Sequence, residues 1–258
     1  MVKGLYTAYT GMLNEQHRMD VLSNNMANVT TVGYKKEGTT SQSFDEVLDL
    51  KIKDSTVGYR LAQREGYNSR GVKIGENYVD WSQGSFRITD NTFDLALSDR
   101  GFFAVEFTNK AGETSTMYTR AGEFELNTQG YLVTHEGDYV LDENNRRIQI
   151  DTLADTTIDR EGNIFQNDRL LTKIRVVDFA DYDYLEKYGE VYYTPIEGAQ
   201  VTTSDAKVYS GYLEAANVSV VSEMVNLIAI SRQYESNQKV IQTIDSTLDV
   251  AVNQIGKV

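Results

Sequence analysis

The stretch that decides the fold is residues 220–248, VVSEMVNLIAISRQYESNQKVIQTIDSTL, in which an apolar residue returns every seven positions. The repeat consists of Val220, Leu227, Tyr234, Ile241 and Leu248, and Ile255 continues it. Such a repeat is typical of a helix that buries one face against another helix. We therefore predict a C-terminal helix within 214–258 that packs against a helical partner.

The beginning of the chain carries the same repeat. Leu5, Met12, Met19 and Met26 lie seven residues apart, and Ala8, Leu22 and Val29 fill the intervening positions. The pattern predicts a helix from about Leu5 to Val29 within 1–35, with His17 facing solvent. Gly33 is suited to the left-handed conformation that ends a helix. We expect the two terminal helices to pair as a coiled-coil-like inner domain.

The C-terminal apolar stripe is wider than the seam between two helices needs. Val221, Val225, Ile228, Val240 and Ile244 flank the main repeat. A helix with so broad an apolar face needs more than one partner. The alternative is that it lies on the β domain of its own chain.

Between the helices, the apolar period becomes two. Short alternating segments separated by turns that contain glycine predict an antiparallel β domain, a sandwich or barrel, over 76–213. One strand is expected over 170–179. Residues 36–75 are polar and mixed, and we expect an extended connector there, with a helical turn or two over 44–52. The fold class is therefore mixed α and β, an antiparallel all-β central domain flanked by terminal helices.

The distribution of charge restricts the kinds of partner. The formal net charge is −13, and residues 36–213 contribute −12 of it. Nucleic-acid binding needs a basic face, so this balance argues against it. The sequence has no cysteine, which excludes disulfides and thiolate sites. No apolar run approaches the ~20 residues of a spanning helix, and we expect no cleavable secretory signal.

The residues that carry chemistry form no recognisable motif, so we expect no catalytic, cofactor or metal site. His17 and His135 are the two histidines, and no zinc-protease pair follows His135. Residues 142–145 and 159–163 lack the glycine and glutamate positions of a calcium loop and are interpreted as hairpin turns. A pair of carboxylates for acid–base chemistry stays open, because the acidic middle offers many.

A second function class also stays open. A set of aromatic side chains is suited either to a sugar-binding platform or to filling a β core. These residues are Trp81, Tyr182, Tyr184, Tyr188, Tyr192 and Tyr193. The competing interpretation is a secreted carbohydrate-binding or hydrolytic β domain with helical ends that oligomerise.

Several segments together resemble the bacterial flagellar rod and hook family. Ser23–Lys35 contains Asn-Asn-Met-Ala-Asn and then Gly-Tyr-Lys, which is similar to that family's N-terminal signature. Further similar segments, in the family's order, are Asp94–Val105, Tyr118–Thr134, Gly211–Val218 and Glu223–Glu235. The sequence departs from the family at Thr92, where proline is common, and over 150–208, which matches poorly. Total length and the connector favour a rod protein over the longer hook protein, with proximal and distal rod both open, and a hook-associated junction protein as a further reading.

The resemblance implies a structural subunit of a hollow helical polymer that transmits torque from motor to hook, and not an enzyme. Its partners would be copies of itself, other rod and hook proteins, and the flagellar export apparatus, through which it leaves the cell without a cleaved signal. Neither a membrane span nor a cofactor is implied. We expect subunit assembly to depend on residues of both ends: Leu5, Met12, Met19, Leu22, Asn25, Met26, Asn28, Gly33, Tyr34, Val220, Met224, Leu227, Ile228, Tyr234, Ile241 and Leu248.

Overall fold

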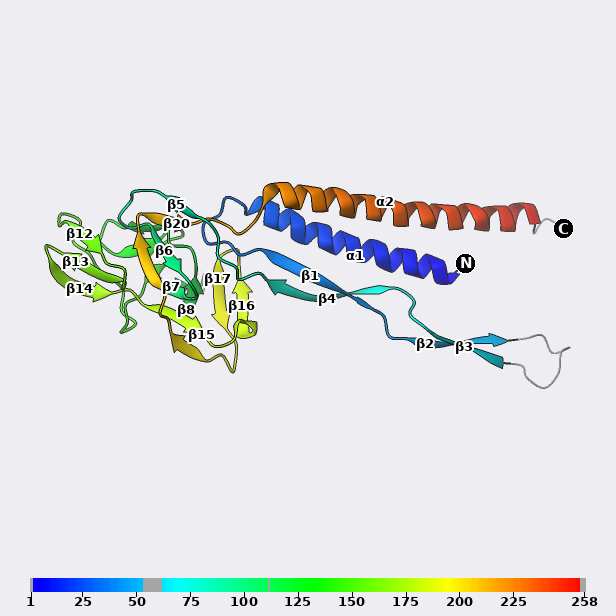
Figure 1. Cartoon of the computed structure of the whole chain (residues 1–258), viewed down its shortest axis with the longest axis horizontal. Coiled ribbons are helices and arrows are strands. Elements are labelled where there is room, and N and C mark those ends of the chain that lie inside the picture. Colours follow the sequence, from blue (N-terminus) through cyan, green and yellow to red (C-terminus); the bar gives the residue numbers. More distant parts are fainter. Residues whose placement is uncertain (1, 53–61, 111, 256–258) are drawn as a thin grey trace. The chain divides into compact units, whose positions relative to one another are not determined.

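The computed structural model describes residues 2–52, 62–110 and 112–255 (Figure 1). The chain divides into two compact units, each built from distant parts of the sequence. Unit 1 comprises Met1–Met26, Glu37–Asp80 and Ser219–Val258, and unit 2 comprises Ala27–Lys36 and Trp81–Val218. The chain therefore passes from one unit to the other four times. Parts of the expected connector (53–61) and of the expected C-terminal helix (256–258) lie outside the described residues.

Two long helices form one part of unit 1. α1 spans Val2–Ala27, and α2 spans Val220–Val250 and continues into a π-helical turn over Ala251–Ile255. Figure 1 shows the two helices side by side and antiparallel. A Cβ built at Gly4 would lie 3.7 Å from Ile244 Cδ1, and one built at Gly11 would lie 2.9 Å from Asn237 Nδ2. Glycines therefore occupy the face of α1 that lies nearest to α2.

The expected connector contains two antiparallel strand pairs of unit 1. β1 (Glu37–Ser43) pairs with β4 (Val72–Val79), and β2 (Val47–Ile52) pairs with β3 (Ala62–Asn68). The helical turn expected over 44–52 is wrong, because the residues of β2 are bonded in register to β3 instead. β1, EGTTSQS, contains no apolar residue, so its sequence gives no period-two signal.

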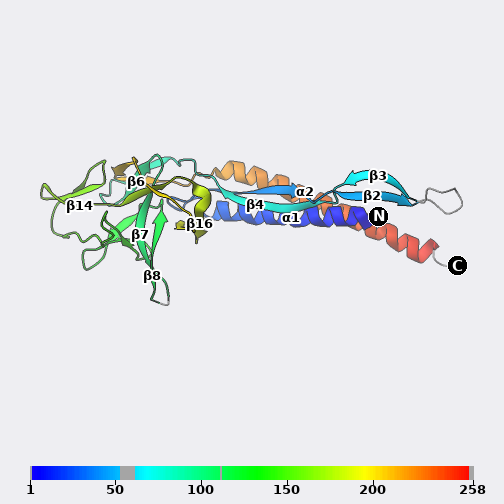
Figure 2. The same ribbon diagram turned by 90° about the horizontal axis from the view of Figure 1, so that it is seen from below.

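Polar side chains along one face of α1 form hydrogen bonds with the β1–β4 pair. Figure 2 shows β4 alongside α1. Thr10 Oγ1 accepts from Val72 N at 3.4 Å, and Ser41 Oγ donates to Asn14 Oδ1 at 3.1 Å. His17 Nε2 lies 3.1 Å from Asn77 Oδ1. The expectation that His17 faces solvent holds only in part, because its side chain is half-buried and contacts Asn77 of β4. Thr10, Asn14 and His17 follow the three- and four-residue spacing of one helix face.

Unit 2 is antiparallel β structure. Its main sheet has nine strands, in the order β16-β17-β8-β7-β11-β10-β9, with β15 beside β7 and β18 beside β15. Smaller sheets pair β12-β13-β14, β19-β6 and β20-β5. The strands are β5 Phe86–Ile88, β6 Leu95–Ser98, β7 Phe102–Thr108, β8 Thr114–Thr119, β9 Phe124–Leu126, β10 Leu132–Thr134, β11 Tyr139–Val140, β12 Thr156–Ile158, β13 Asn163–Gln166, β14 Arg169–Lys173, β15 Val176–Phe179, β16 Leu185–Tyr188, β17 Tyr192–Pro195, β18 Val201–Thr203, β19 Lys207–Ser210 and β20 Tyr212–Glu214, with a short 3-10 helix, η1, at Tyr182–Tyr184.

The single strand expected over 170–179 is in fact two strands of different sheets. β14 pairs with β13, whereas β15 pairs with β7 and β18. Ile174 and Arg175 lie between them and make separate contacts: Ile174 N donates to Gly162 O and Arg175 N to Leu141 O. Apolar residues recur on both sides of this change of sheet, at Leu170, Leu171, Val176 and Val177, so the sequence pattern conceals the break.

Two apolar clusters fill unit 2. The larger includes Leu95, Phe103, Phe124 and Ile148, and the smaller includes Phe102. Trp81 packs against the smaller cluster, with its ring 5.5 Å from that of Phe102 and 4.9 Å from those of Tyr182 and Tyr193. Tyr192 and Tyr193 are buried. Four of the six aromatic residues considered for a sugar platform therefore serve the core, while Tyr184 and Tyr188 are exposed.

Candidate assembly surfaces

The first turns of α2 expose large apolar side chains. Val221, Met224, Val225 and Ile228 are each between 49% and 73% exposed, and we call them the α2 patch. Burying one such side chain is worth about 1.5–3 kcal/mol, so leaving four in solvent marks a surface that a partner can cover.

A second exposed apolar surface lies near the start of α1. Tyr6, Tyr9 and Leu13 share one helix face and are between 43% and 59% exposed, and we call them the α1 patch. Because the helices are antiparallel and Gly11 faces Asn237, the α1 patch lies beside the C-terminal half of α2. The α2 patch lies beside the C-terminal half of α1. Unit 1 thus has two apolar patches at opposite ends of its helical pair.

Most of the helical residues that we expected to mediate assembly are half-buried, and their side chains do not lie on the exposed faces of α1 and α2. A regular set on α2 is half-buried or buried, at three- and four-residue spacing: Val220, Glu223, Leu227, Ile230, Tyr234, Asn237, Ile241 and Ile244. On α1, Leu5, Met12, Met19, Leu22 and Met26 are half-buried. Of the expected helical residues, Met224, Ile228 and Leu248 are the exposed ones. Sequence reasoning missed Tyr6, Tyr9 and Leu13, although their spacing of three and four is a helix-face signal next to the main repeat.

Asn25 and Asn28, two of the residues expected to mediate assembly, form hydrogen bonds within their own chain. Asn25 is buried, its Nδ2 donates to Glu37 O at 2.8 Å, and its Oδ1 accepts from Glu37 N at 2.9 Å. This two-bond contact fixes the start of β1 against the end of α1, within unit 1. Asn28, in unit 2, donates from Nδ2 to Glu190 Oε2 at 2.7 Å. Both asparagines therefore have partners inside their own unit.

Gly33 and Tyr34 lie in the interior of unit 2. Gly33 has φ +69°, and a Cβ there would lie 2.3 Å from Ala121 N. Tyr34 is fully buried, and Lys187 Nζ lies 4.3 Å from its ring centroid. A fully buried side chain has no surface for a neighbouring subunit in this conformation. An assembly role for Gly33 and Tyr34 stays a prediction that would have to act through the fold.

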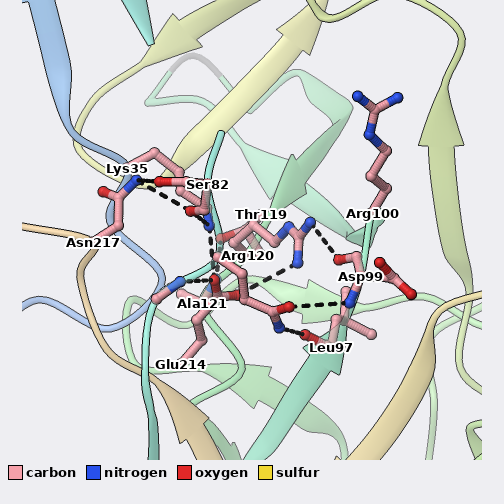
Figure 3. A network of polar contacts seen from close by, with 12 residues as sticks. Lys35, Ser82, Leu97, Asp99, Arg100, Thr119, Arg120, Ala121, Glu214 and Asn217 are labelled. Carbon is pink, nitrogen blue, oxygen red and sulfur yellow. Dashed lines mark hydrogen bonds and ion pairs between the residues drawn. The ribbon is translucent and has the colours of Figure 1, made fainter. Parts of the chain in front are cut away.

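Lys35, the residue after Tyr34, belongs to a buried ion network with Arg120 and Glu214 (Figure 3). Lys35 Nζ lies 2.7 Å from Glu214 Oε1, and Arg120 Nη1 lies 3.4 Å from Glu214 Oε2. Arg120 Nη2 also donates to the Asp99 carbonyl at 2.7 Å. All three charged side chains are at most 4% exposed. Removing one partner of a buried pair typically costs about 3–5 kcal/mol, because the other charge is left in an apolar interior.

Residues 142–145 and 159–163, which we interpreted as hairpin turns and not as calcium loops, form turns. Asp142 Oδ1 accepts from Asn144 N and Arg146 N, both at 2.8 Å, and Gly162 N donates to Asp159 O at 2.9 Å. In the part of the chain that the structure describes, no three histidine or carboxylate side chains are grouped as metal ligands. Nor is any helix there both long and apolar enough to cross a membrane.

Comparison with known proteins places the chain among the axial proteins of the bacterial flagellum. Residues 5–35 match the model "Flagella basal body rod protein", 96–166 the "Flagellar hook protein FlgE/F/G D1 domain", and 209–255 the "Flagellar basal body rod FlgEFG protein C-terminal". The flagellar basal-body rod protein FlgG of Bacillus subtilis is 33% identical over 98% of this chain and 99% of its own. FlgF of Caulobacter vibrioides and the hook-basal body complex protein FlhO of Bacillus subtilis are each 30% identical, over the whole of both chains. The chain belongs to the flagellar basal-body rod protein family.

Proposed function

We propose that this protein is a structural subunit of the flagellar rod, located in the basal body, and that copies join through the two patches of unit 1. The α1 patch of one copy packs against the α2 patch of the next. The observation that carries this proposal is the exposure of Tyr6, Tyr9 and Leu13 on one helix and of the α2 patch on the other. The family resemblance implies a hollow helical polymer that transmits torque, and we propose this role for the chain.

The position of the patches favours an open polymer. Two different surfaces at opposite ends of the helical pair give heterologous, head-to-tail contacts. Such contacts continue into a helix unless the rotation between copies closes a ring. A symmetric dimer would instead need two such contacts to form at once, with the α1 patch of each copy on the α2 patch of the other.

The magnitudes favour assembly with several neighbours. Seven partly exposed side chains, at about 1.5–3 kcal/mol for each full burial, contribute about 5–10 kcal/mol when half of their surface is covered. Association costs about 4–15 kcal/mol in lost translational and rotational freedom. A single contact of this kind is therefore marginal, and a subunit held by several neighbours is stable.

We also propose that α1 and α2 pair as a coiled-coil-like inner domain. The half-buried set on α2 has heptad spacing, and Gly4, Ala8 and Gly11 of α1 have matching positions. Small residues on α1 permit a close approach of the two backbones. Other contacts with rod and hook proteins, and passage through the flagellar export apparatus, belong to the same proposal.

The test is a charge in the α2 patch with a neighbouring control. Val225→Asp removes apolar surface and adds a charge, whereas Asn226→Asp adds the same charge at the next exposed position. In a strain without its own copy of this gene, we expect Val225→Asp to abolish rods in isolated basal bodies and to abolish swimming. Asn226→Asp should restore both. Normal rods with Val225→Asp, at wild-type protein level and helical content, would contradict the proposal.

The competing sugar-binding function has less support. Four of the six aromatic residues of its proposed platform lie in or against the two core clusters, with Tyr193 fully buried. We propose a structural and not an enzymatic role for unit 2. Binding of the whole chain to a glycan array, lost on Tyr184→Ala and Tyr188→Ala together, would favour the competing function.

A further inference from the structure

Unit 2 consists of two chain segments and therefore has four ends, at Ala27, Lys36, Trp81 and Val218. Along the chain, load can pass between the two units only through these ends. Three of them are tied together by side-chain bonds inside unit 2.

Asn217 makes the first set of these bonds. Its Oδ1 accepts from Lys36 N at 2.7 Å, and its Nδ2 donates to Ser82 O at 3.1 Å and to Ser82 Oγ at 3.0 Å. One amide side chain thus joins the residue that ends the first segment to the second residue of the other segment. Asn217 itself is next to the last residue of unit 2.

The buried ion network makes the second set between the same three stretches. Lys35 Nζ donates to Ser82 O at 2.8 Å and pairs with Glu214, whose Oε1 also accepts from Gly84 N at 3.0 Å. Figure 3 shows Lys35, Ser82, Glu214 and Asn217 converging on one place. The fourth end differs: near Ala27, Asn28 donates to Glu190 instead.

Side chains attach Lys35 and Lys36 to the other two stretches. The stretches at 82–86 and 212–217 are also joined by the β5–β20 pair and by Ala215 N to Ser85 O at 2.9 Å. Lys35 and Lys36 lie outside the strands described for unit 2, and nearby Gly33 N donates to Glu214 O at 2.8 Å. Lys35 and Glu214 are buried, Asn217 is half-buried and Ser82 is exposed. Directional bonds to the two buried charges fix position more strictly than apolar contact, since a buried group that loses its partner stays desolvated.

We propose that Lys35, Ser82, Glu214 and Asn217 form a polar clasp that holds three of the four ends of unit 2 in fixed mutual positions, so that torsional load is shared among three stretches of chain. This inference rests on the proposed function, because it assigns to these residues the stiffness that a torque-bearing subunit needs. The clasp is distinct from both apolar patches, and it acts within one subunit.

The first test measures the clasp in the purified full-length chain. Asn217→Ala removes the acceptor of the Lys36 amide, and Asn144→Ala, in an exposed turn, is the matched control. We expect hydrogen exchange at the Lys36 amide to accelerate at least tenfold in Asn217→Ala and to be unchanged in Asn144→Ala. Amides of β7 and β8 should keep their protection in both. Unchanged exchange at Lys36 in Asn217→Ala would overturn the clasp.

The second test measures load. In cells that depend on this protein, Asn217→Ala should build rods in wild-type number. The swimming speed of this variant, relative to wild type, should be at least twofold lower in a viscous medium than in a dilute one. Asn144→Ala should swim as wild type in both media. The inference would be overturned if the speed of Asn217→Ala changed with viscosity as in wild type. It would also be overturned if this variant built no rods, because that result would indicate an assembly role.

If the wild-type chain itself failed to restore rods, the proposed function would be wrong. The exchange experiment would still show whether the clasp exists.

Discussion

At the scale of single residues, Gly33 shows a position that accepts no side chain. Its φ of +69° costs an L-residue about 1–2 kcal/mol, and a Cβ would lie within 2.7 Å of three backbone atoms of residues 120 and 121. Backbone atoms of a strand end yield less easily than a side chain, so overpacking adds about 1–3 kcal/mol. We predict that Gly33→Ala destabilises unit 2 by roughly 3 kcal/mol, measured by urea unfolding with Trp81 fluorescence.

The control for this prediction is Gly189→Ala. Gly189 has φ +64°, close to that of Gly33, but a Cβ there meets no atom within 4 Å. It carries the backbone cost without the steric one. Equal losses in the two variants would mean that the contact with residues 120 and 121 costs nothing.

The ion pair of Glu106 and Arg147 gives a pH-dependent prediction. Two hydrogen bonds, from Arg147 Nη2 at 2.6 Å and Nε at 3.1 Å, lower the pKa of Glu106. A lowered folded-state pKa stabilises the fold above the unfolded pKa of about 4.3, and this contribution is lost as pH falls through the folded-state value. Because both groups are partly exposed, we expect less than about 1 kcal/mol.

The measurement compares wild type with Glu106→Gln, which cannot titrate. Urea unfolding should show wild type more stable at pH 7, and the difference should shrink toward pH 3 as the wild-type carboxyl takes up its proton. A difference of the same size at both pH values would show that packing or the neutral hydrogen bond, and not the charge, stabilises this site.

At the scale of elements, Gly11 tests what brings α1 and α2 together. Alanine in place of glycine favours a helix by about 1 kcal/mol. The added Cβ would lie 2.9 Å from Asn237 Nδ2, the end of a side chain that can rotate away. We predict that Gly11→Ala raises the thermal midpoint of helical unfolding, followed by circular dichroism at 222 nm.

The opposite result would show what limits the contact between α1 and α2. If Gly11→Ala lowered the midpoint, close backbone approach would outweigh helix propensity at this position. The double variant Gly11→Ala with Asn237→Ala should then recover the midpoint, because it removes the atom that the new Cβ meets.

The elements also show what the sequence could and could not predict. The heptads at 5–26 and 220–248 predicted both helices, because burial at fixed spacing leaves a periodic trace. β1 escaped prediction, because its partners on α1 are Asn14 and other polar groups that leave no apolar period. Gly33 and Tyr34 were singled out by family motif, yet their place inside unit 2 depends on contacts with residues far along the chain, which spacing cannot reveal.

At the scale of the whole molecule, the division into two units predicts two separable unfolding events. Leu227 lies half-buried on the seam of α2, in unit 1, while Trp81 reports on the aromatic cluster of unit 2. A charge at Leu227 must either be buried or separate α2 from its packing partner, and either outcome lowers stability by several kcal/mol. We therefore predict that Leu227→Asp loses helical signal at 222 nm and loses rod assembly.

The near-ultraviolet spectrum of Leu227→Asp and its unfolding midpoint measured by Trp81 fluorescence should stay as in wild type. The control is Gln233→Asp, at an exposed position of the same helix, which should leave the helical signal and the Trp81 midpoint unchanged. If Leu227→Asp also lowered the Trp81 midpoint, the seam of α2 would support the β core as well, and the α2 repeat would belong to an intramolecular core more than to an assembly device.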